Sequence, residues 1–375
     1  MRELVLGGRR VADDTGCYII AEVGNNHQGS LEKAKELILA AKECGVDAVK
    51  LQKRDNRTLF TSALYDQPYE NENSFGPTYG AHREALEFGR EEWQELLAFA
   101  ANLDLPLFAT AFDEPSADFL ADLDTPAFKV ASADNVNTPL LRHIAAHGKP
   151  IVLSTGGATL EDIDRAVAAI LPLNSQLCVL QCTAAYPVEV DELNLSVIAT
   201  LRERYPDVVI GLSDHQNGIS MALVAYMLGA RVIEKHFTLN HAWKGTDHAF
   251  SLMPEGMRKL VRDLRRVPDA LGDGVKRRLE TETAPLAKMG TKLVATRALE
   301  AGRILEAGDL VPKSPADGGL APYELDGLLG RRLVRALIAE ENIALSDVDA
   351  GSRQSSHTCD SSSSTSMASS PTIGC

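Results

Sequence analysis

Short apolar runs alternate with longer amphipathic stretches over the first two thirds of the chain. Eight runs have the length and content of buried strands: residues 19–23, 48–52, 107–110, 127–131, 151–155, 178–183, 208–213 and 232–237. Stretches with helical spacing of apolar residues lie between them: residues 31–44, 91–101, 160–171, 196–205 and 219–228. Eight strands that alternate with helices predict an α/β fold, a parallel (β/α)8 TIM barrel, over residues 1–270.

Polar side chains mark the end of each predicted strand. They are Glu22, Lys50, Gln52, Thr110, Lys129, Ser132, Ser154, Thr155, Gln181, Thr183, Ser213, His215, Glu234 and His236. Several of them are two residues apart, so the strand pleat points both members of a pair to the same side. Because active sites of TIM barrels lie at the C-terminal ends of the strands, we expect these side chains to share one site.

Three further segments depart from the barrel pattern. Residues 54–87 form a long insertion rich in Asn, Tyr, Pro and Gly, typical of a lid or substrate wall, with a solvated spacer as the alternative. A linker at residues 271–292 leads to residues 293–349, where short strands broken by glycines predict a small β-rich domain. Residues 350–375 are Ser-rich with almost no apolar content, and predict a disordered tail.

The charge balance excludes several classes of protein. Acidic residues outnumber basic ones by 52 to 38, and the net charge of −14 argues against a broad nucleic-acid-binding face. No apolar run approaches the roughly 20 residues that span a bilayer, and no signal-type stretch begins the chain. We therefore expect a soluble, cytoplasmic protein without a nucleic-acid or membrane partner. Cys17, Cys44, Cys178 and Cys182 lie in or beside apolar segments, which predicts reduced thiols.

Two histidines stand at the polar ends of neighbouring predicted strands. His215 ends the sequence GLSDH, and His236 ends the sequence VIEKH. Two imidazoles at adjacent strand tips, beside Glu and Lys side chains, predict a divalent-metal site at the mouth of the barrel. Because two imidazoles are fewer ligands than a structural zinc site supplies, we expect the metal to exchange.

These motifs, taken together in their order along the chain, resemble the sialic acid synthase (NeuB) family. The resemblance covers about residues 16–349 and rests on AEVGNNHQG (21–29), VKLQ (49–52), FKVAS (128–132), LSTG (153–156), QCT (181–183), YP (186–187), GLSDH (211–215), IEKHF (233–237) and TD (246–247). It extends to the C-terminal module, which is similar to the SAF, or antifreeze-like, domain of those enzymes. Such a domain implies a domain-swapped homodimer in which each copy caps the partner's barrel; packing within one chain is the alternative.

The resemblance implies condensation of phosphoenolpyruvate with an N-acetylated hexosamine, N-acetylmannosamine or its 6-phosphate, to give a nine-carbon sialic acid and phosphate. Lys50 and Lys129 suit the phosphate and carboxylate of phosphoenolpyruvate. The side chains expected to donate hydrogen bonds to the same substrate are Thr110, Ser132, Ser154 and Ser213. The side chains that match sugar-contacting positions of the family are Gln52, Asp134, Tyr186 and Asp247.

The expected cofactor is a divalent metal, Mn2+ with Mg2+ or Co2+ as alternatives, on His215 and His236. Such an ion would polarise the aldehyde of the acceptor as a Lewis acid. Glu22 is a candidate to help deliver water to C2 of the intermediate. These three residues are therefore the predicted catalytic group.

Three positions depart from the family pattern and bear on the acceptor. Asp134 stands where bacterial members more often have Glu, and Ala184 replaces an Asn that lines the phosphoenolpyruvate pocket in some members. Ser314 replaces the Arg of a common Lys-Arg-Pro motif, which in relatives reaches the sugar's N-acetyl group from the partner subunit. These departures leave the identity of the amino sugar open.

Other functions remain open at this point. Within the synthase class, the alternatives are legionaminic and pseudaminic acid synthases, whose acceptors are diacetamido-trideoxyhexoses. A Schiff-base aldolase would use a strand lysine such as Lys129 as its nucleophile. A non-catalytic carbohydrate-binding or ice-binding protein is suggested by the C-terminal module alone.

Overall fold

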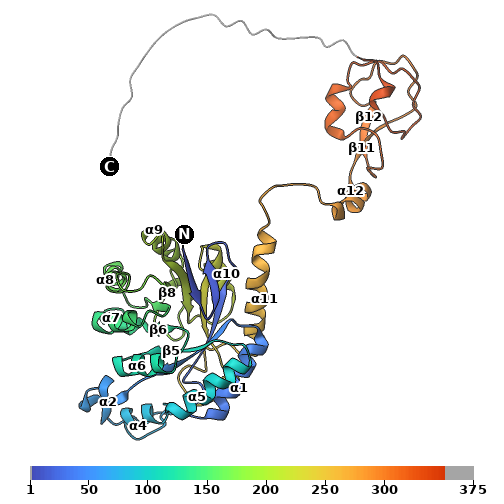
Figure 1. The fold of residues 1–375 in the computed structure, drawn as a ribbon. Coiled ribbons are helices and arrows are strands. Elements are labelled where there is room, and N and C mark those ends of the chain that lie inside the picture. The colour runs from blue at the N-terminus through green and yellow to red at the C-terminus, as the bar shows by residue number, and fades with distance from the viewer. Residues whose placement is uncertain (1, 351–375) are drawn as a thin grey trace, which may run out of the picture. The chain divides into compact units, whose positions relative to one another are not determined.

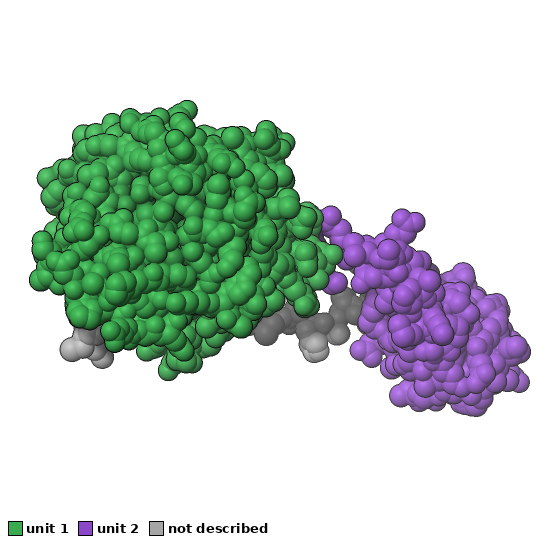
Figure 2. Space-filling model, turned by 90° about the horizontal axis from the view of Figure 1, so that it is seen from below, with its two compact units in different colours: residues 1–273 green, residues 274–375 purple. Residues whose placement is uncertain are grey.

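The computed structural model describes residues 2–350 and divides the chain into two compact units, residues 1–273 and 274–375, coloured separately in Figure 2. The Ser-rich tail predicted from residue 350 onward, with Cys359 and Cys375, falls almost wholly outside the described residues. Within the described part, no helix combines the length and apolar character that a membrane span requires.

Eight parallel strands close into a barrel in the first unit (Figure 1). They are β3 (Tyr18–Gly24), β4 (Ala48–Lys53), β5 (Leu107–Ala111), β6 (Phe128–Val130), β7 (Ile151–Ser154), β8 (Leu177–Cys182), β9 (Val209–Asp214) and β10 (Val232–His236). Each strand pairs with the next in sequence, and β10 closes the barrel against β3. All eight predicted strands are present, and the predicted TIM barrel is confirmed.

Helices surround the barrel and cover the outer face of its strands (Figure 1). They are α1 (Leu31–Cys44), α5 (Arg90–Asn102), α6 (Glu114–Asp122), α7 (Thr138–Ala146), α8 (Leu160–Ile170), α9 (Val197–Arg204), α10 (Ser220–Met227) and α11 (Pro254–Leu271). Their apolar faces and the outward side chains of the strands form one large core, in which Leu37, Trp93 and Leu153 are fully buried. Because this core lies outside the strands, the space inside the barrel is available for polar side chains at its C-terminal end.

The strand register brings the polar strand ends to one level. Glu22 on β3 lies opposite Lys50 on β4, and Ser213 on β9 lies opposite Glu234 on β10. Side chains at opposite positions of neighbouring strands point to the same face of the sheet. The polar residues that the sequence scatters over more than 200 positions therefore meet inside one end of the barrel.

An N-terminal hairpin, which the sequence analysis did not predict, closes the other end of the barrel. Its strands are β1 (Glu3–Leu6) and β2 (Arg9–Ala12), joined by a two-glycine turn with positive φ at both residues. Leu6 and Val11 are buried in the same cluster as Phe108, which points into the barrel interior. This apolar plug excludes water from the N-terminal end and leaves the C-terminal end as the open one.

The insertion after β4 is ordered by short helices and an aromatic cluster. Its helices are α2 (Asn56–Leu59), α3 (Ser62–Tyr65) and α4 (Tyr79–Glu84). The buried ring of His82 lies 4.7 Å from the ring of Tyr69 and 5.8 Å from that of Phe75, and its Nδ1 accepts a hydrogen bond from the amide of Phe75. The insertion is thus a fixed wall of packed side chains.

The second unit contains a small β-rich domain with an internal repeat. Its elements are η3 (Glu280–Glu282), α12 (Thr283–Met289), β11 (Lys292–Ala295), β12 (Leu310–Lys313), η4 (Pro322–Gly327) and η5 (Leu345–Asp347). Buried Asp309 pairs with Arg297, and buried Asp347 pairs with Arg335, at the same sequence spacing. In both halves the Asp also accepts a hydrogen bond from the amide three residues earlier. The two halves therefore use the same ion-paired turn.

Candidate active site

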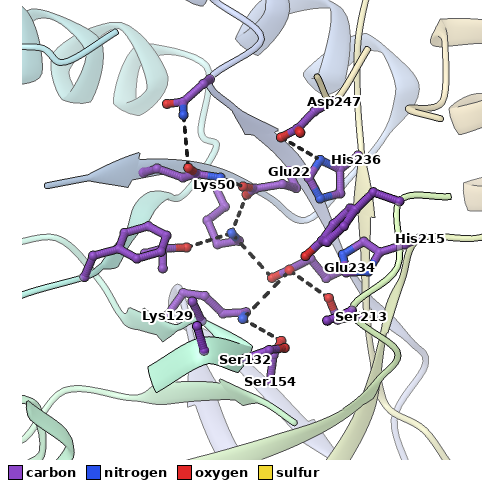
Figure 3. Close-up of a pocket in the computed structure, with 18 of the residues that line it drawn as sticks. Glu22, Lys50, Lys129, Ser132, Ser154, Ser213, His215, Glu234, His236 and Asp247 are labelled. Atoms are coloured by element: carbon purple, nitrogen blue, oxygen red, sulfur yellow. Dashed lines mark hydrogen bonds and ion pairs between the residues drawn. The ribbon is translucent and has the colours of Figure 1, made fainter. Parts of the chain in front are cut away.

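A cavity of about 490 Å³ opens at the C-terminal ends of the barrel strands (Figure 3). Its lining side chains are Glu22, Asn25, Lys50, Gln52, Arg54, Arg83, Thr110, Phe112, Lys129, Ala131, Ser132, Ala133, Ser154, Ala184, Tyr186, Ser213, His215, Glu234, His236, Thr246 and Asp247. Twelve of the thirteen predicted site residues are in this set. The structure thus brings together residues from all eight barrel strands or the loops that follow them.

Asp134 is the predicted residue that the cavity lining does not include. It ends η1 (Ser132–Asp134), the short turn after β6. Its carboxylate accepts a long hydrogen bond of 3.4 Å from Asn137, and burial raises its pKa. This carboxylate is therefore not among the groups that line the cavity.

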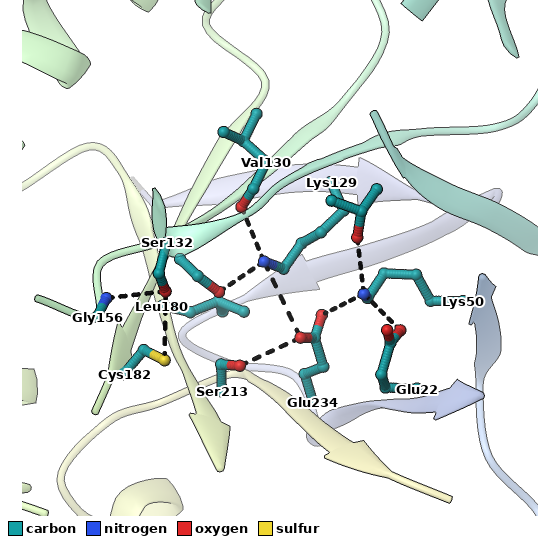
Figure 4. Close-up of polar contacts among 12 residues, drawn as sticks. Glu22, Lys50, Lys129, Val130, Ser132, Gly156, Leu180, Cys182, Ser213 and Glu234 are labelled. Carbon is teal, nitrogen blue, oxygen red and sulfur yellow. Dashed lines mark hydrogen bonds and ion pairs between the residues drawn. The ribbon is translucent and has the colours of Figure 1, made fainter. Parts of the chain in front are cut away.

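Two buried lysines line the cavity, and each is held by neighbouring polar groups (Figure 4). Lys50 forms an ion pair with Glu22 and donates to Thr110 Oγ1 at 2.9 Å. Lys129 donates to Ser154 Oγ at 2.6 Å and to the Val130 carbonyl at 2.8 Å. Both lysines are at most 3 % exposed. Hydroxyl groups therefore hold both ammonium groups in place within a site that excludes most water.

Glu234 lies between the two lysines, and the sequence analysis assigned it no role. Its carboxylate oxygens are 3.8 Å from Lys50 Nζ and 4.0 Å from Lys129 Nζ, and one of them accepts from Ser213 Oγ at 3.1 Å. Burial alone would raise its pKa, but Lys129 and then Lys50 hold the pKa of Glu234 below its usual value. The residue therefore acts as an ionised counter-charge. The sequence signal that could have assigned Glu234 to the site is its place among the polar residues at the strand ends, two residues before His236.

Glu22 has the opposite electrostatic character. Burial raises the pKa of Glu22 to about 7, and the neighbouring Glu234 adds to this, while Lys50 opposes it. Gln52 donates to the same carboxylate at 2.9 Å. A carboxyl group that titrates near neutral pH is suited to exchange protons with a substrate or with water.

Ser132 is held by the loop after β7. Its hydroxyl accepts from the Gly156 amide at 2.9 Å and donates to Cys182 Sγ at 3.5 Å. An added Cβ at Gly156 would lie 2.8 Å from Ala184 Cβ and 2.9 Å from Ser132 Oγ. Glycine is therefore required here for the backbone to approach the cavity so closely.

The two histidines lie side by side, with 5.3 Å between their ring centroids. Nδ1 of His215 is 2.9 Å from the Thr183 carbonyl oxygen, which identifies this nitrogen as the protonated one when the ring is neutral. Nδ1 of His236 is buried without a hydrogen-bond partner among the described residues, and lies 3.7 Å from Asp247 Oδ2 (Figure 3). Burial, followed by the charge of His215, places the pKa of His236 well below its usual value. A neutral His236 has a lone pair available for a metal ion.

Aromatic rings cover the histidines on the open side. The ring of Tyr186 lies 4.2 Å from that of His215, and the ring of Phe250 lies 4.9 Å from that of His236. Tyr186 is 55 % exposed, so it stands at the mouth of the cavity, where a second substrate would enter.

A second group of metal-ligating side chains lies on the outer helices. Oδ1 of Asp118, on α6, lies 2.7 Å from Nε2 of His143 and 3.2 Å from Nε2 of His147. Over residues 2–350, this is the one trio of His, Cys, Asp or Glu whose ligand atoms all lie within 4.8 Å of one another. The two cavity histidines therefore do not form such a trio with a third side chain in the described part of the chain.

Fold and site together define a TIM-barrel enzyme whose cavity combines two buried lysines, several hydroxyls and a histidine pair. The NeuB family model matches residues 37–276, and the SAF domain model matches residues 291–349. The chain belongs to the NeuB family and carries a C-terminal SAF domain.

Relatives named for several different activities cover most of the chain. The N-acetylneuraminate-9-phosphate synthase of Mus musculus is 37 % identical over 347 residues, 92 % of this chain and 97 % of that protein. The N,N'-diacetyllegionaminic acid synthase of Legionella pneumophila is 35 % identical and covers 89 % of this chain and 95 % of its own length. The pseudaminic acid synthase of Campylobacter jejuni is 33 % identical, with coverages of 85 % and 93 %.

A solved structure agrees with these sequence relatives. The N-acetylneuraminic acid synthetase of Leptospira borgpetersenii, in complex with citrate, has a TM-score of 0.66 and 31 % identity, over 76 % of this chain and 95 % of that one. The chain is therefore an enzyme of the sialic acid synthase type, a phosphoenolpyruvate-dependent transferase that forms a carbon–carbon bond.

Proposed function

We propose that the chain condenses phosphoenolpyruvate with N-acetylmannosamine or its 6-phosphate, and with water, to give a nine-carbon sialic acid and inorganic phosphate. The observation that carries this proposal is the pair of buried lysines, Lys50 and Lys129, in one hydroxyl-lined cavity beside two strand-tip histidines. Two fixed cations match a small substrate with two anionic groups.

In this reaction, the bound phosphoenolpyruvate replaces contacts that the carboxylates make in the free site. Glu234 faces both lysines, and Ser213, Ser154 and Thr110 supply hydroxyls at the same level. Hydroxyls that turn from protein partners to a phosphate or carboxylate keep the substrate oriented. Its C3 is then presented toward the mouth of the cavity, where the acceptor enters.

The reaction joins C3 of phosphoenolpyruvate to C1 of the open-chain sugar. Water then adds at C2, and the tetrahedral centre so formed releases phosphate and leaves a 2-keto group. The aldehyde oxygen gains one proton. The attacking water loses one proton as it adds at C2, and the hydroxyl so formed gives up the second to the departing phosphate when the tetrahedral centre collapses. Glu22, with its pKa near 7, is placed to take the proton from water.

We further propose that His215 and His236 hold a divalent metal, Mn2+ with Mg2+ or Co2+ as alternatives. The donor set supports this, because the Thr183 contact leaves Nε2 of His215 unprotonated and because Nδ1 of His236 is buried without a described partner. When bound, the ion would polarise the acceptor aldehyde as a Lewis acid. Asp247 Oδ2 lies 3.7 Å from Nδ1 of His236, so a metal held there would also be close to this carboxylate.

The runner-up function is a legionaminic or pseudaminic acid synthase, which would use the same chemistry on a diacetamido-trideoxyhexose. Two of the relatives carry those names, whereas the mouse relative is named for a 9-phosphate product. The test is phosphate release from phosphoenolpyruvate with Mn2+, run in parallel on N-acetylmannosamine, its 6-phosphate and the diacetamido sugars. Turnover of a diacetamido sugar alone would favour the runner-up. No turnover with any of them, from folded protein, would refute both.

We propose a homodimer in which each SAF domain caps the partner's cavity, and a cytoplasmic location, both supported by the family membership. Size-exclusion chromatography with light scattering should give twice the chain mass of 40.5 kDa. A monomer mass would favour the alternative, in which the SAF domain packs within its own chain.

A further inference from the structure

Two arginines that the sequence analysis did not single out line the cavity on the side of the insertion. Arg54 follows β4 directly, and Arg83 lies on α4. Arg54 is only 7 % exposed, whereas Arg83 is half-buried. The guanidinium plane of Arg54 is fixed by the ring of Phe112, 3.6 Å away, and by a 2.8 Å hydrogen bond from Nη2 to Gln52.

Arg54 is poorly neutralised for a buried charge. Its Nη1 has no hydrogen-bond partner among the described residues, and the carboxylate it approaches, that of Glu87, is 3.9 Å away. Glu87 is already engaged by Lys53 Nζ at 3.0 Å. A buried guanidinium nitrogen without a partner is costly, and an incoming anion would remove that cost.

Arg83 adds a second cation to the same place. Its Nε and Nη2 both donate to Tyr79 Oη, at 3.2 and 3.0 Å, and it forms no ion pair with a carboxylate in residues 2–350. Burial, and after it the charge of Arg83, lowers the pKa of Arg54 to about 10, so the two guanidinium groups influence each other. Paired guanidinium groups bind phosphate through several parallel hydrogen bonds.

This arginine pair is separate from the lysines. Gln52 bonds to Arg54 on one side and to Glu22 on the other, and Glu22 in turn pairs with Lys50. Asp247 lines the same cavity but lies beside His236 (Figure 3), and it makes no ion pair with either arginine within the described residues. The cavity therefore has two cationic ends with a polar middle.

We propose that Arg54 and Arg83 bind a phosphate group at the far end of the acceptor, so that the substrate is a hexosamine 6-phosphate. The inference rests on the proposed function, in which the lysines take phosphoenolpyruvate and C1 of the acceptor meets its C3. C6 then lies at the opposite end of the sugar. A 6-deoxy acceptor has no oxygen at C6 to carry phosphate, so the arginine pair disfavours the diacetamido-trideoxyhexoses.

The test is calorimetric binding of N-acetylmannosamine 6-phosphate and of N-acetylmannosamine to the full chain. We expect the phosphorylated sugar to bind about 10- to 100-fold more tightly, the range for hydrogen bonds to charged groups. The preference should fall to within about threefold in Arg54→Gln/Arg83→Gln. Arg57→Gln is the matched control, because Arg57 lies in the same insertion, is exposed and stacks on Tyr65 outside the cavity lining.

Arg83→Gln alone guards against misfolding of the double variant, since Arg83 is half-buried. A folded Arg83→Gln protein that keeps the full preference, or a wild type without one, would overturn the subsite. The phosphate-release assay separates the two proposals. Turnover of the unphosphorylated sugar with no preference in binding would refute the subsite and support the synthase; the predicted preference without phosphate release would do the reverse.

Discussion

Lys235 and Asp214 form an ion pair with 2.7 Å between Nζ and Oδ2, and both side chains are at most 1 % exposed. They lie opposite each other on β10 and β9, and the next positions along the pleat, Ser213 and Glu234, face the cavity. The Lys235 ammonium also donates to the Gln216 carbonyl, just beyond His215. This buried pair therefore locks the two strands whose tips carry the histidines.

Lys235→Met should destabilise the barrel by about 3–5 kcal/mol, because it leaves the Asp214 carboxylate buried without its partner. The matched control is Lys259→Met, which removes an exposed i,i+4 pair with Glu255 and should cost at most about 0.5 kcal/mol. Urea denaturation followed by tryptophan fluorescence reports on the barrel alone, since Trp93 and Trp243 both belong to the first unit. Equal losses in the two variants would contradict the role given to the buried pair.

The metal proposal predicts that the wild-type protein binds Mn2+ and that the double variant His215→Ala/His236→Ala does not. Removal of both imidazoles takes away the two proposed nitrogen ligands, and electron paramagnetic resonance of free Mn2+ measures the loss directly. His143→Ala serves as the control, because it breaks the surface cluster with Asp118 and leaves the cavity intact. If Mn2+ binding is lost in His143→Ala but kept in the variant without the cavity histidines, the proposed site is wrong. With the cavity site correct, EDTA should abolish phosphate release and added Mn2+ should restore it.

Gly156→Ala should weaken phosphoenolpyruvate binding. The new Cβ would meet Ala184 Cβ at 2.8 Å and Ser132 Oγ at 2.9 Å, so the Ser132 hydroxyl must move. Loss of one hydrogen bond to an anionic substrate corresponds to a rise in KM of about tenfold or more. Gly327→Ala is the control, because an added Cβ there meets nothing within 4 Å. An unchanged KM for phosphoenolpyruvate in the Gly156 variant would show that Ser132 does not contact this substrate.

The sequence was sufficient for the barrel because its strands are buried on both faces. A strand such as β5 (Leu107–Ala111) must be apolar along its length, and polar residues are admitted only where it reaches the open end. The N-terminal hairpin escaped prediction because its strands have only four residues each and the second begins with Arg9 and Arg10. The Gly7–Gly8 turn between two short apolar runs was the signal that could have found it.

The sequence could predict which strand-end residues belong to the site, but not how they lie relative to one another. Strand-end polar residues could be read from the pattern, yet only the closed barrel places Glu234 between Lys50 and Lys129. Arg54 and Arg83 lie in an insertion without periodicity, so nothing in the pattern distinguishes them from solvated arginines. Their burial and the missing partner of Arg54 are properties of the folded chain alone.

The Schiff-base alternative predicts a covalent bond between Lys129 and a keto acid. Burial lowers the pKa of Lys129, as that chemistry requires, but its ammonium is held by Ser154, by the Val130 carbonyl and by the charge of Glu234. We therefore expect that borohydride treatment with pyruvate adds no mass to the protein. Lys129→Gln should instead lower kcat/KM for phosphoenolpyruvate by about 100-fold or more, through loss of a charged contact in a water-poor site. A borohydride-dependent adduct on Lys129 would favour the aldolase.

Glu22 should make the stability of the barrel fall as the pH rises from 4.5 to 7. Its pKa is raised from 4.5 to about 7 in the folded protein, so in this window the folded state holds a proton that the unfolded chain has lost. Unfolding then releases a proton, and higher pH favours it, by on the order of 3 kcal/mol across the window. Glu234 contributes with the opposite sign, since its lowered pKa gives stability that is lost on acidification. The effect of Glu22 must therefore be isolated by difference.

The difference in unfolding free energy between Glu22→Gln and wild type isolates the contribution of Glu22 to the pH dependence of stability. A neutral amide carries no such proton. The free energy of unfolding of the variant, relative to that of wild type, should therefore rise steadily between pH 4.5 and 7 and stay constant above pH 7. Glu32→Gln, on the exposed first turn of α1, is the matched control at a surface carboxylate. Urea titrations at half-unit pH steps, followed by tryptophan fluorescence, measure both series. A pH-independent difference for Glu22→Gln would mean that folding does not raise the pKa of Glu22, and the carboxylate would then be a much weaker proton acceptor than the proposed reaction requires.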